Sequence, residues 1–86
     1  MPEISRFFGI VIRMFFDDHN PPHFHATYGD CEVLIDIDHL SAFSGYLPPR
    51  ALGLVIEWAT LHREELLADW NKARELQSPD KIDPLQ

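Results

Sequence analysis

The sequence is poor in cysteine and has no long apolar run. Cysteine occurs once in 86 residues, as Cys31, which excludes an internal disulfide and a zinc site built from several cysteines. No segment approaches the roughly 18 apolar residues of a membrane span. The N-terminal segment is unlike a signal peptide, because the acid Glu3 stands where a basic residue belongs. We therefore expect a cytoplasmic protein in which Cys31 is a small apolar filler.

Positive charge is also scarce. Seven Lys and Arg residues stand against fourteen Asp and Glu residues, and the formal net charge is −7 with neutral histidines. A protein that binds nucleic acid usually presents a basic surface to the phosphates, and this sequence contains no cluster of Lys and Arg. The charge therefore disfavours a nucleic-acid partner and is compatible with a basic protein partner.

What the chain does contain is a large share of apolar residues. Hydrophobic residues make up 45% of the sequence and aromatic residues 12%, which is too apolar for a disordered chain. The 86 residues form one domain, 1–86, and a domain this small buries little core. We therefore expect a homo-oligomer or a complex with a small partner protein.

The pattern of apolar residues predicts an α+β fold. Residues 4–16 are rich in β-branched and aromatic types, and Gly9 marks a bend or a turn that divides them. The Pro21-Pro22 pair ends the strand ladder, because proline lacks the N–H that pairing needs. The expected elements are strands at about 4–16, 23–28, 31–37 and 42–46, a helix at about 49–76 with a kink near Thr60 as the alternative to a straight helix, and a tail at 77–86. They predict an antiparallel sheet of three to four strands with one long C-terminal helix packed on one face.

The Gly29-Asp30 pair predicts the turn of a hairpin. With this turn, strand alternation places Phe24 on the apolar face of the sheet. His23 and His25 then share the other face, and His23 lies opposite Asp36. The expected core comprises residues of the hairpin and the helix: Phe24, Ala26, Tyr28, Val33, Ile35, Ile37, Val55, Ala59, Leu66 and Trp70.

The first half of the predicted helix is apolar on nearly every side. In the segment 51–61, eight of the eleven residues are apolar, and one small sheet cannot cover all of them. Leu54, Trp58 and Leu61 form a second stripe beside the expected core stripe. We therefore predict that these three residues form an interface with a partner.

Three histidines lie within seven positions of the segment DDHNPPHFHA. Imidazole and carboxylate ligands together suit zinc or another divalent first-row ion. The candidate metal ligands are His19, His23, His25 and Asp17, with Asp18 and Asp36 as further oxygen donors. The spacing is not a specific metal signature. The structural alternative is that the histidines cap the diproline turn and donate hydrogen bonds to the aspartates and carbonyls around it.

The same segment also suits acid–base chemistry without a metal. A carboxylate beside a histidine holds the ring in one tautomer and favours its charged form, so His23 and Asp36 form a candidate proton-transfer pair. Arg13 on the preceding strand could hold an anion on the same face. An enzyme of this kind would act on a phosphodiester, and its candidate catalytic residues are His23, His25, Asp36 and Arg13.

In two motifs, the chain resembles a family of small bacterial proteins of unknown function. The motifs are HNPPHFHA at residues 19–26 and LPPRALGLVIEWATLHREELLADW at residues 47–70. Members are often encoded beside a second small protein. The resemblance therefore implies a component of a toxin–antitoxin-like pair that acts through protein–protein association, and it implies no catalytic residue. The alternatives drawn from the residues themselves are a small metal- or histidine-dependent enzyme with nuclease-like phosphodiesterase activity, and a metal-binding module.

Overall fold

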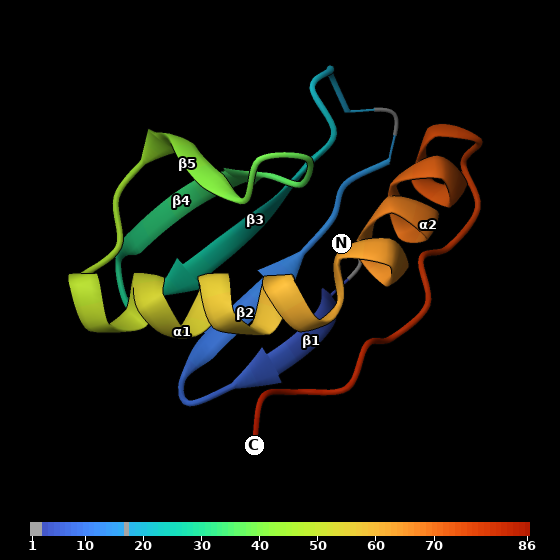
Figure 1. Ribbon diagram of the computed structural model, residues 1–86. Helices are drawn as coiled ribbons and strands as arrows, with labels where there is room; N and C mark the ends of the chain where they lie inside the picture. Colours follow the sequence, from blue (N-terminus) through green and yellow to red (C-terminus); the bar gives the residue numbers. More distant parts are fainter. Residues whose placement is uncertain (1–2, 17) are drawn as a thin grey trace.

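Each strand of the sheet pairs with the next strand in the sequence. The structure is a computed structural model that describes residues 3–16 and 18–86, and within them it contains a five-stranded antiparallel sheet of order β1-β2-β3-β4-β5 (Figure 1). The strands are β1 (Glu3–Phe7), β2 (Ile10–Arg13), β3 (His23–Tyr28), β4 (Cys31–Asp36) and β5 (Ser41–Gly45). The helices α1 (Pro49–Leu61) and α2 (Arg63–Arg74) follow. The predicted α+β class with an antiparallel sheet is confirmed, whereas the predicted three to four strands and one long helix are only partly matched by the five strands and two helices.

The segment predicted as one strand at 4–16 forms two strands joined by a tight turn. Phe8 has a φ of 50° and Gly9 a φ of 79°, so the chain reverses between β1 and β2. Two successive positive φ angles are typical of a type I′ hairpin turn, where glycine is favoured because it lacks a Cβ. This turn adds the fifth strand to the sheet.

The predicted register of the central hairpin is confirmed. β3 and β4 pair antiparallel across the Gly29-Asp30 turn, from Tyr28 opposite Cys31 to His23 opposite Asp36. Because side chains alternate along a strand, this register sends one set of residues to the apolar face and the other set to the polar face.

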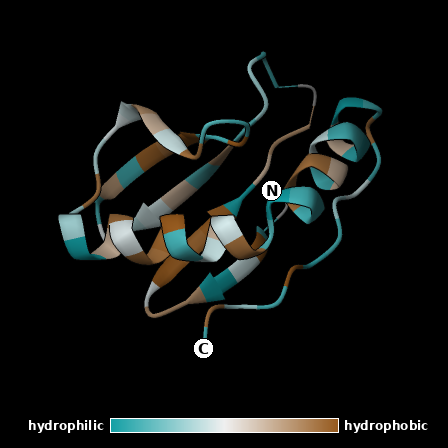
Figure 2. Ribbon diagram, viewed as in Figure 1, coloured by the Kyte–Doolittle hydropathy of each residue, from teal (hydrophilic) through white to brown (hydrophobic). Residues whose placement is uncertain are grey.

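The core lies between the sheet and α1, which crosses one face of the sheet (Figure 1). Hydrophobic residues recur along the strands and along α1 (Figure 2). Nine of the ten predicted core residues are buried, and Tyr28 is the exception at 42% exposed. Tyr28 ends β3 beside the β3–β4 turn, where it lines an open groove together with Ala51 and Leu54 of α1. Its position on the apolar face is therefore right, and its predicted burial is wrong.

The helical region is broken where a single helix was predicted. α1 ends at Leu61 and α2 begins at Arg63, with His62 between them at φ −124°. A straight helix from 49 to 74 would be about 39 Å long at 1.5 Å per residue, whereas the longest extent of the molecule is 33 Å. The Thr60 hydroxyl donates to the Ile56 carbonyl, a contact that often bends helices. The break therefore lets α2 bury its own apolar residues against the core.

No helix in the described residues is long and apolar enough to span a bilayer.

The C-terminal tail covers one edge of the sheet. The Ile82 N–H donates to the Ile4 carbonyl of β1 at 2.8 Å, and the side chains of Ile82 and Leu85 are buried. The Trp58 indole N–H donates to the Asp83 carbonyl at 2.8 Å, and Trp58 is 0% exposed. Trp58 therefore belongs to the core, and its predicted place at an interface is wrong because the tail lies over it.

Asp69 anchors the start of the tail from α2. Its Oδ1 accepts the Asp80 N–H at 2.9 Å, Lys72 forms an ion pair with Asp80, and Oδ2 has no partner among the described residues. Burial raises the pKa of Asp69 to about 6, although the hydrogen bond from Asp80 lowers it; the charges of Asp80 and Glu65 raise it further, while that of Lys72 lowers it. A carboxyl with a raised pKa favours the folded state only while it is protonated.

We expect Asp69→Asn to remove part of the pH dependence of stability. The native pKa of about 6 lies above the ordinary value of 3.8, so the stability contributed by Asp69 is present below about 3.8 and is lost as the pH rises through 6. The loss should be on the order of 2–3 kcal/mol in the wild-type protein and absent in the variant. Urea denaturation from pH 4 to pH 7.5 measures it. Glu57→Gln, at an exposed position of α1, is the control, and a wild-type-like pH profile for Asp69→Asn would contradict the prediction.

Candidate metal centre

The candidate site lies on the polar face of the sheet, at the end of β3 where the chain enters it. His23 and His25 alternate along β3 with Phe24, which packs in the core with residues of α1, so both histidine side chains leave the other face of the sheet. The described part of the preceding loop brings Asp18 to the same place. The placement of both histidines on one face, away from the α1 side, is as predicted.

Asp18 connects the two imidazoles. Its Oδ2 lies 3.1 Å from His23 Nε2 and 3.2 Å from His25 Nε2. The three potential ligand atoms lie within 4.8 Å of one another. The His19 N–H donates to Asp18 Oδ1 at 2.8 Å and so orients the carboxylate. One oxygen therefore faces two ring nitrogens at once.

The hydrogen bonds of His23 fix its tautomer. Its Nδ1 lies 2.7 Å from the carbonyl oxygen of Pro21, which can only accept a hydrogen bond, so Nδ1 carries the proton. In the neutral ring, Nε2 then presents a lone pair. That lone pair points at another acceptor, Asp18 Oδ2, and the contact is unfavourable unless a cation lies between them.

His25 is held in the same way. Its Nδ1 lies 3.2 Å from Glu32 Oε2, on the next strand, and its Nε2 lies 3.2 Å from Asp18 Oδ2. A neutral imidazole has one N–H, so it can donate to only one of these two carboxylates. With Nδ1 donating to Glu32, His25 also directs a lone pair at Asp18. The cluster is therefore satisfied by protons on both Nε2 atoms or by a cation among the three groups.

Asp18 is suited to stay ionised in this cluster. Burial alone would raise its pKa, but the hydrogen bonds from the His19 N–H and from His25, together with the charges of His23 and His25, lower it overall. An anionic oxygen is what two imidazolium groups or a metal ion require.

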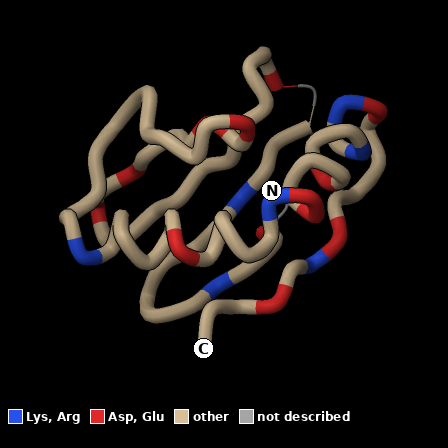
Figure 3. Tube along the Cα trace, viewed as in Figure 1, with Lys and Arg blue, Asp and Glu red and all other residues tan. Residues whose placement is uncertain are grey.

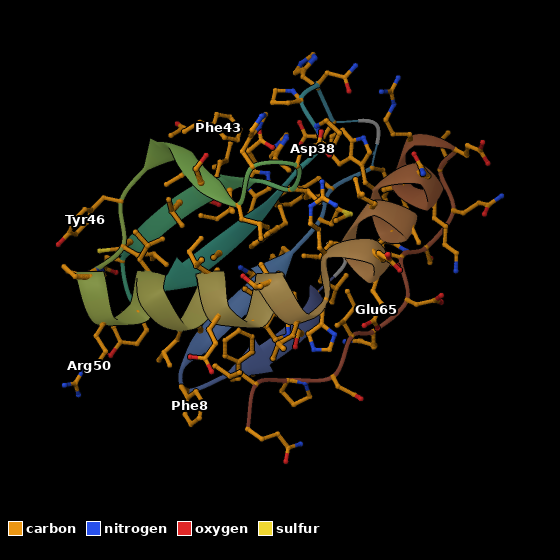
Figure 4. The ribbon with its side chains drawn as sticks, in the orientation of Figure 1. Phe8, Asp38, Phe43, Tyr46, Arg50 and Glu65 are labelled. Carbon is orange, nitrogen blue, oxygen red and sulfur yellow. The ribbon has the colours of Figure 1, made fainter. Side chains whose placement is uncertain are left out.

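Aromatic rings surround both histidines. The His23 ring lies 5.2 Å from the Trp70 ring of α2 and 5.5 Å from Phe43, which projects from β5 (Figure 4). Phe15 meets the His25 ring edge to face at 4.4 Å. His23 is 4% exposed, which is more buried than its assignment to a polar working face implies. The apolar periodicity favoured one continuous helix, so the return of α2 over this end of the sheet was not expected.

The remaining predicted site residues have other partners. Asp36 accepts hydrogen bonds from His39 and from two loop N–H groups, and no hydrogen bond joins it to His23 within the described residues. Arg13 lies opposite His25 in the register, but its guanidinium donates to Thr27. The predicted acid–base pair is therefore not assembled.

One of the predicted metal ligands lies outside the cluster, and another is not among the described residues. His19 is exposed and outside the ligand cluster of the described residues, and Asp17 lies outside the part of the chain that the structure describes. The carboxylate in the cluster is Asp18. Parity along the loop could not distinguish these neighbours, because the loop has no strand register.

The comparisons with known proteins identify one domain family. A family model for a domain of unknown function, DUF4160, matches residues 9–71. The chain belongs to the DUF4160 family. The matched DUF4160 stretch includes the three residues of the cluster, and it ends before the tail. No curated protein and no solved structure matches the chain.

We expect His23 to contribute to stability as well as to the cluster. His23→Ala removes a buried ring from between Trp70 and Phe43 and leaves the Pro21 carbonyl without its donor, which should cost about 2 kcal/mol. His39→Ala, at an exposed loop position, should change stability by less than about 0.5 kcal/mol. Urea denaturation measures both, and equal effects would show that the His23 packing is not stabilising.

Proposed function

We propose that this DUF4160 protein binds a divalent first-row transition-metal ion, such as Zn²⁺, through Asp18, His23 and His25. The observation that supports the proposal is the convergence of two Nε2 atoms on one carboxylate oxygen while both Nδ1 atoms face acceptors. Metal-binding histidines usually donate their other N–H to a carbonyl or a carboxylate, as Pro21 and Glu32 allow here.

The distances are compatible with such an ion. In a tetrahedral site with bonds of about 2.1 Å, neighbouring ligand atoms lie about 3.4 Å apart. The two Nε2–Oδ2 distances, 3.1 and 3.2 Å, are close to this value. Two imidazoles and one carboxylate would hold the ion and leave a coordination position for water. That ligand count is found in catalytic rather than structural zinc sites, so it favours a metal-dependent hydrolase as the second candidate function.

Titration of tag-free protein with Zn²⁺ in a calorimeter, and with Co²⁺ in a visible spectrometer, tests the proposal. We expect one ion per chain, and an affinity at least about tenfold lower for His25→Ala and for Asp18→Asn. His39→Ala is the matched control, since His39 also bonds to an aspartate but lies outside the cluster. Absence of binding, or an equal loss in His39→Ala, would overturn the proposal.

A graded series at Glu32 tests the support of His25. Glu32→Ala removes the acceptor of the Nδ1 proton and should lower metal affinity about tenfold. Glu32→Gln keeps an acceptor oxygen and should lower it less. Glu57→Gln again serves as the control for loss of one negative charge. If Glu32→Ala binds the ion as tightly as the wild-type protein, Glu32 does not orient the ligand.

The expected role in a toxin–antitoxin-like pair stays a prediction. Of the three predicted interface residues, Leu61 is 67% exposed and Leu54 is half-buried, so both lie within reach of a partner. The exposed Leu61 and the half-buried Leu54 support association with another protein, independently of the metal.

A further inference from the structure

An open groove lies where α1 meets the two hairpin turns. It has a volume of about 540 Å³. Its walls come from the β1–β2 turn, the end of β3 and the first two turns of α1, and its principal lining residues are Phe8, Ile10, Tyr28, Arg50, Ala51 and Leu54. Phe8 is 59% exposed, so the rim presents aromatic surface to solvent. The groove and the cluster at His23 lie at opposite ends of β3.

Arg50 is the only charged residue among the described residues that line the groove. It forms no ion pair within the described residues, whereas Arg6, Arg63 and Lys72 each pair with a carboxylate. Figure 4 shows Arg50 and Phe8 projecting from the same side of the molecule. Arginine and aromatic residues are enriched among the residues that contribute most to binding energy at protein interfaces.

We infer that this groove binds a short segment of another protein that carries large apolar side chains around a single carboxylate. The apolar side chains would fill the space between Tyr28 and Leu54, and the carboxylate would pair with Arg50. The rest of the segment would be neutral or basic, because acidic residues are spread over the whole chain (Figure 3) and its net charge of −7 repels acid-rich peptides. The inference does not depend on the metal site.

The charge pattern argues against a second copy of this chain as the occupant. A two-fold contact would bring the same surface of both copies together. The groove of a second copy would offer Arg50 no carboxylate, because no acidic residue lines the groove in the described part of the chain. A nucleic acid is disfavoured too, since a single cation cannot follow a phosphate backbone.

A displayed library of random 12-residue peptides tests the inference. Peptides are selected on the full-length protein and counter-selected on Arg50→Glu, and the enriched sequences are then synthesised for affinity measurement. We expect a motif with one Asp or Glu between large apolar residues. Arg50→Gln should weaken binding about tenfold, and Arg50→Glu should regain affinity for a peptide whose acid is replaced by Lys.

A pair of leucines on α1 provides the matched control. Leu54→Asp places a charge in the groove and should abolish peptide binding, whereas Leu61→Asp, outside the groove on the same helix, should leave it unchanged. Arg50 is exposed, so Arg50→Gln should fold normally. Its peptide affinity therefore tests the inference even if Leu54→Asp does not fold. Four outcomes would overturn the inference: no enriched peptide, a motif without a carboxylate, unchanged binding to Arg50→Gln, or a homodimer that Leu54→Asp dissociates.

Discussion

The turn at Gly29-Asp30 fixes the register on which both faces of the sheet depend. Once Tyr28 lies opposite Cys31, alternation leaves no freedom in the rest of the hairpin. Phe24 must then point toward α1, and His23 and His25 must point away from it. A shift of one residue would exchange the two faces and put both imidazoles against the apolar helix. The polar cluster and the core are therefore consequences of one local constraint.

The two-layer fold explains why polar side chains lie on the face of the sheet opposite α1. With α1 on one side only, the opposite side of the central strands meets solvent or loops and must carry polar residues. Charged and hydroxyl side chains follow this rule at Arg13, Thr27 and Glu32. The histidines depart from it only partly, because α2 and the loop before β3 cover them. The histidines are thus polar groups in a partly desolvated environment, where a lone pair without a hydrogen-bond donor or a cation destabilises the folded state.

Sequence reasoning succeeded where the backbone has a fixed period. Strand parity located the core residues of β3 and β4 and the shared face of the histidines. It failed where distant segments decide the outcome. Trp58 looked like an interface residue because nothing in α1 shows that the tail will return to accept its indole proton. The choice of Asp18 likewise depends on the path of an irregular loop.

The helix break at His62 underlies two features that the sequence analysis did not predict, the burial of His23 and the covering of Trp58 by the tail. An unbroken helix from 49 to 74 would be about 39 Å long, which exceeds the 33 Å extent of the molecule. The turn between α1 and α2 brings Trp70 back to 5.2 Å from the His23 ring. It also brings Asp69 to the point where the tail begins, so the tail can cross Trp58 and reach β1. One irregular residue in the helical region thus determines both the burial of the candidate site and the closure of the core.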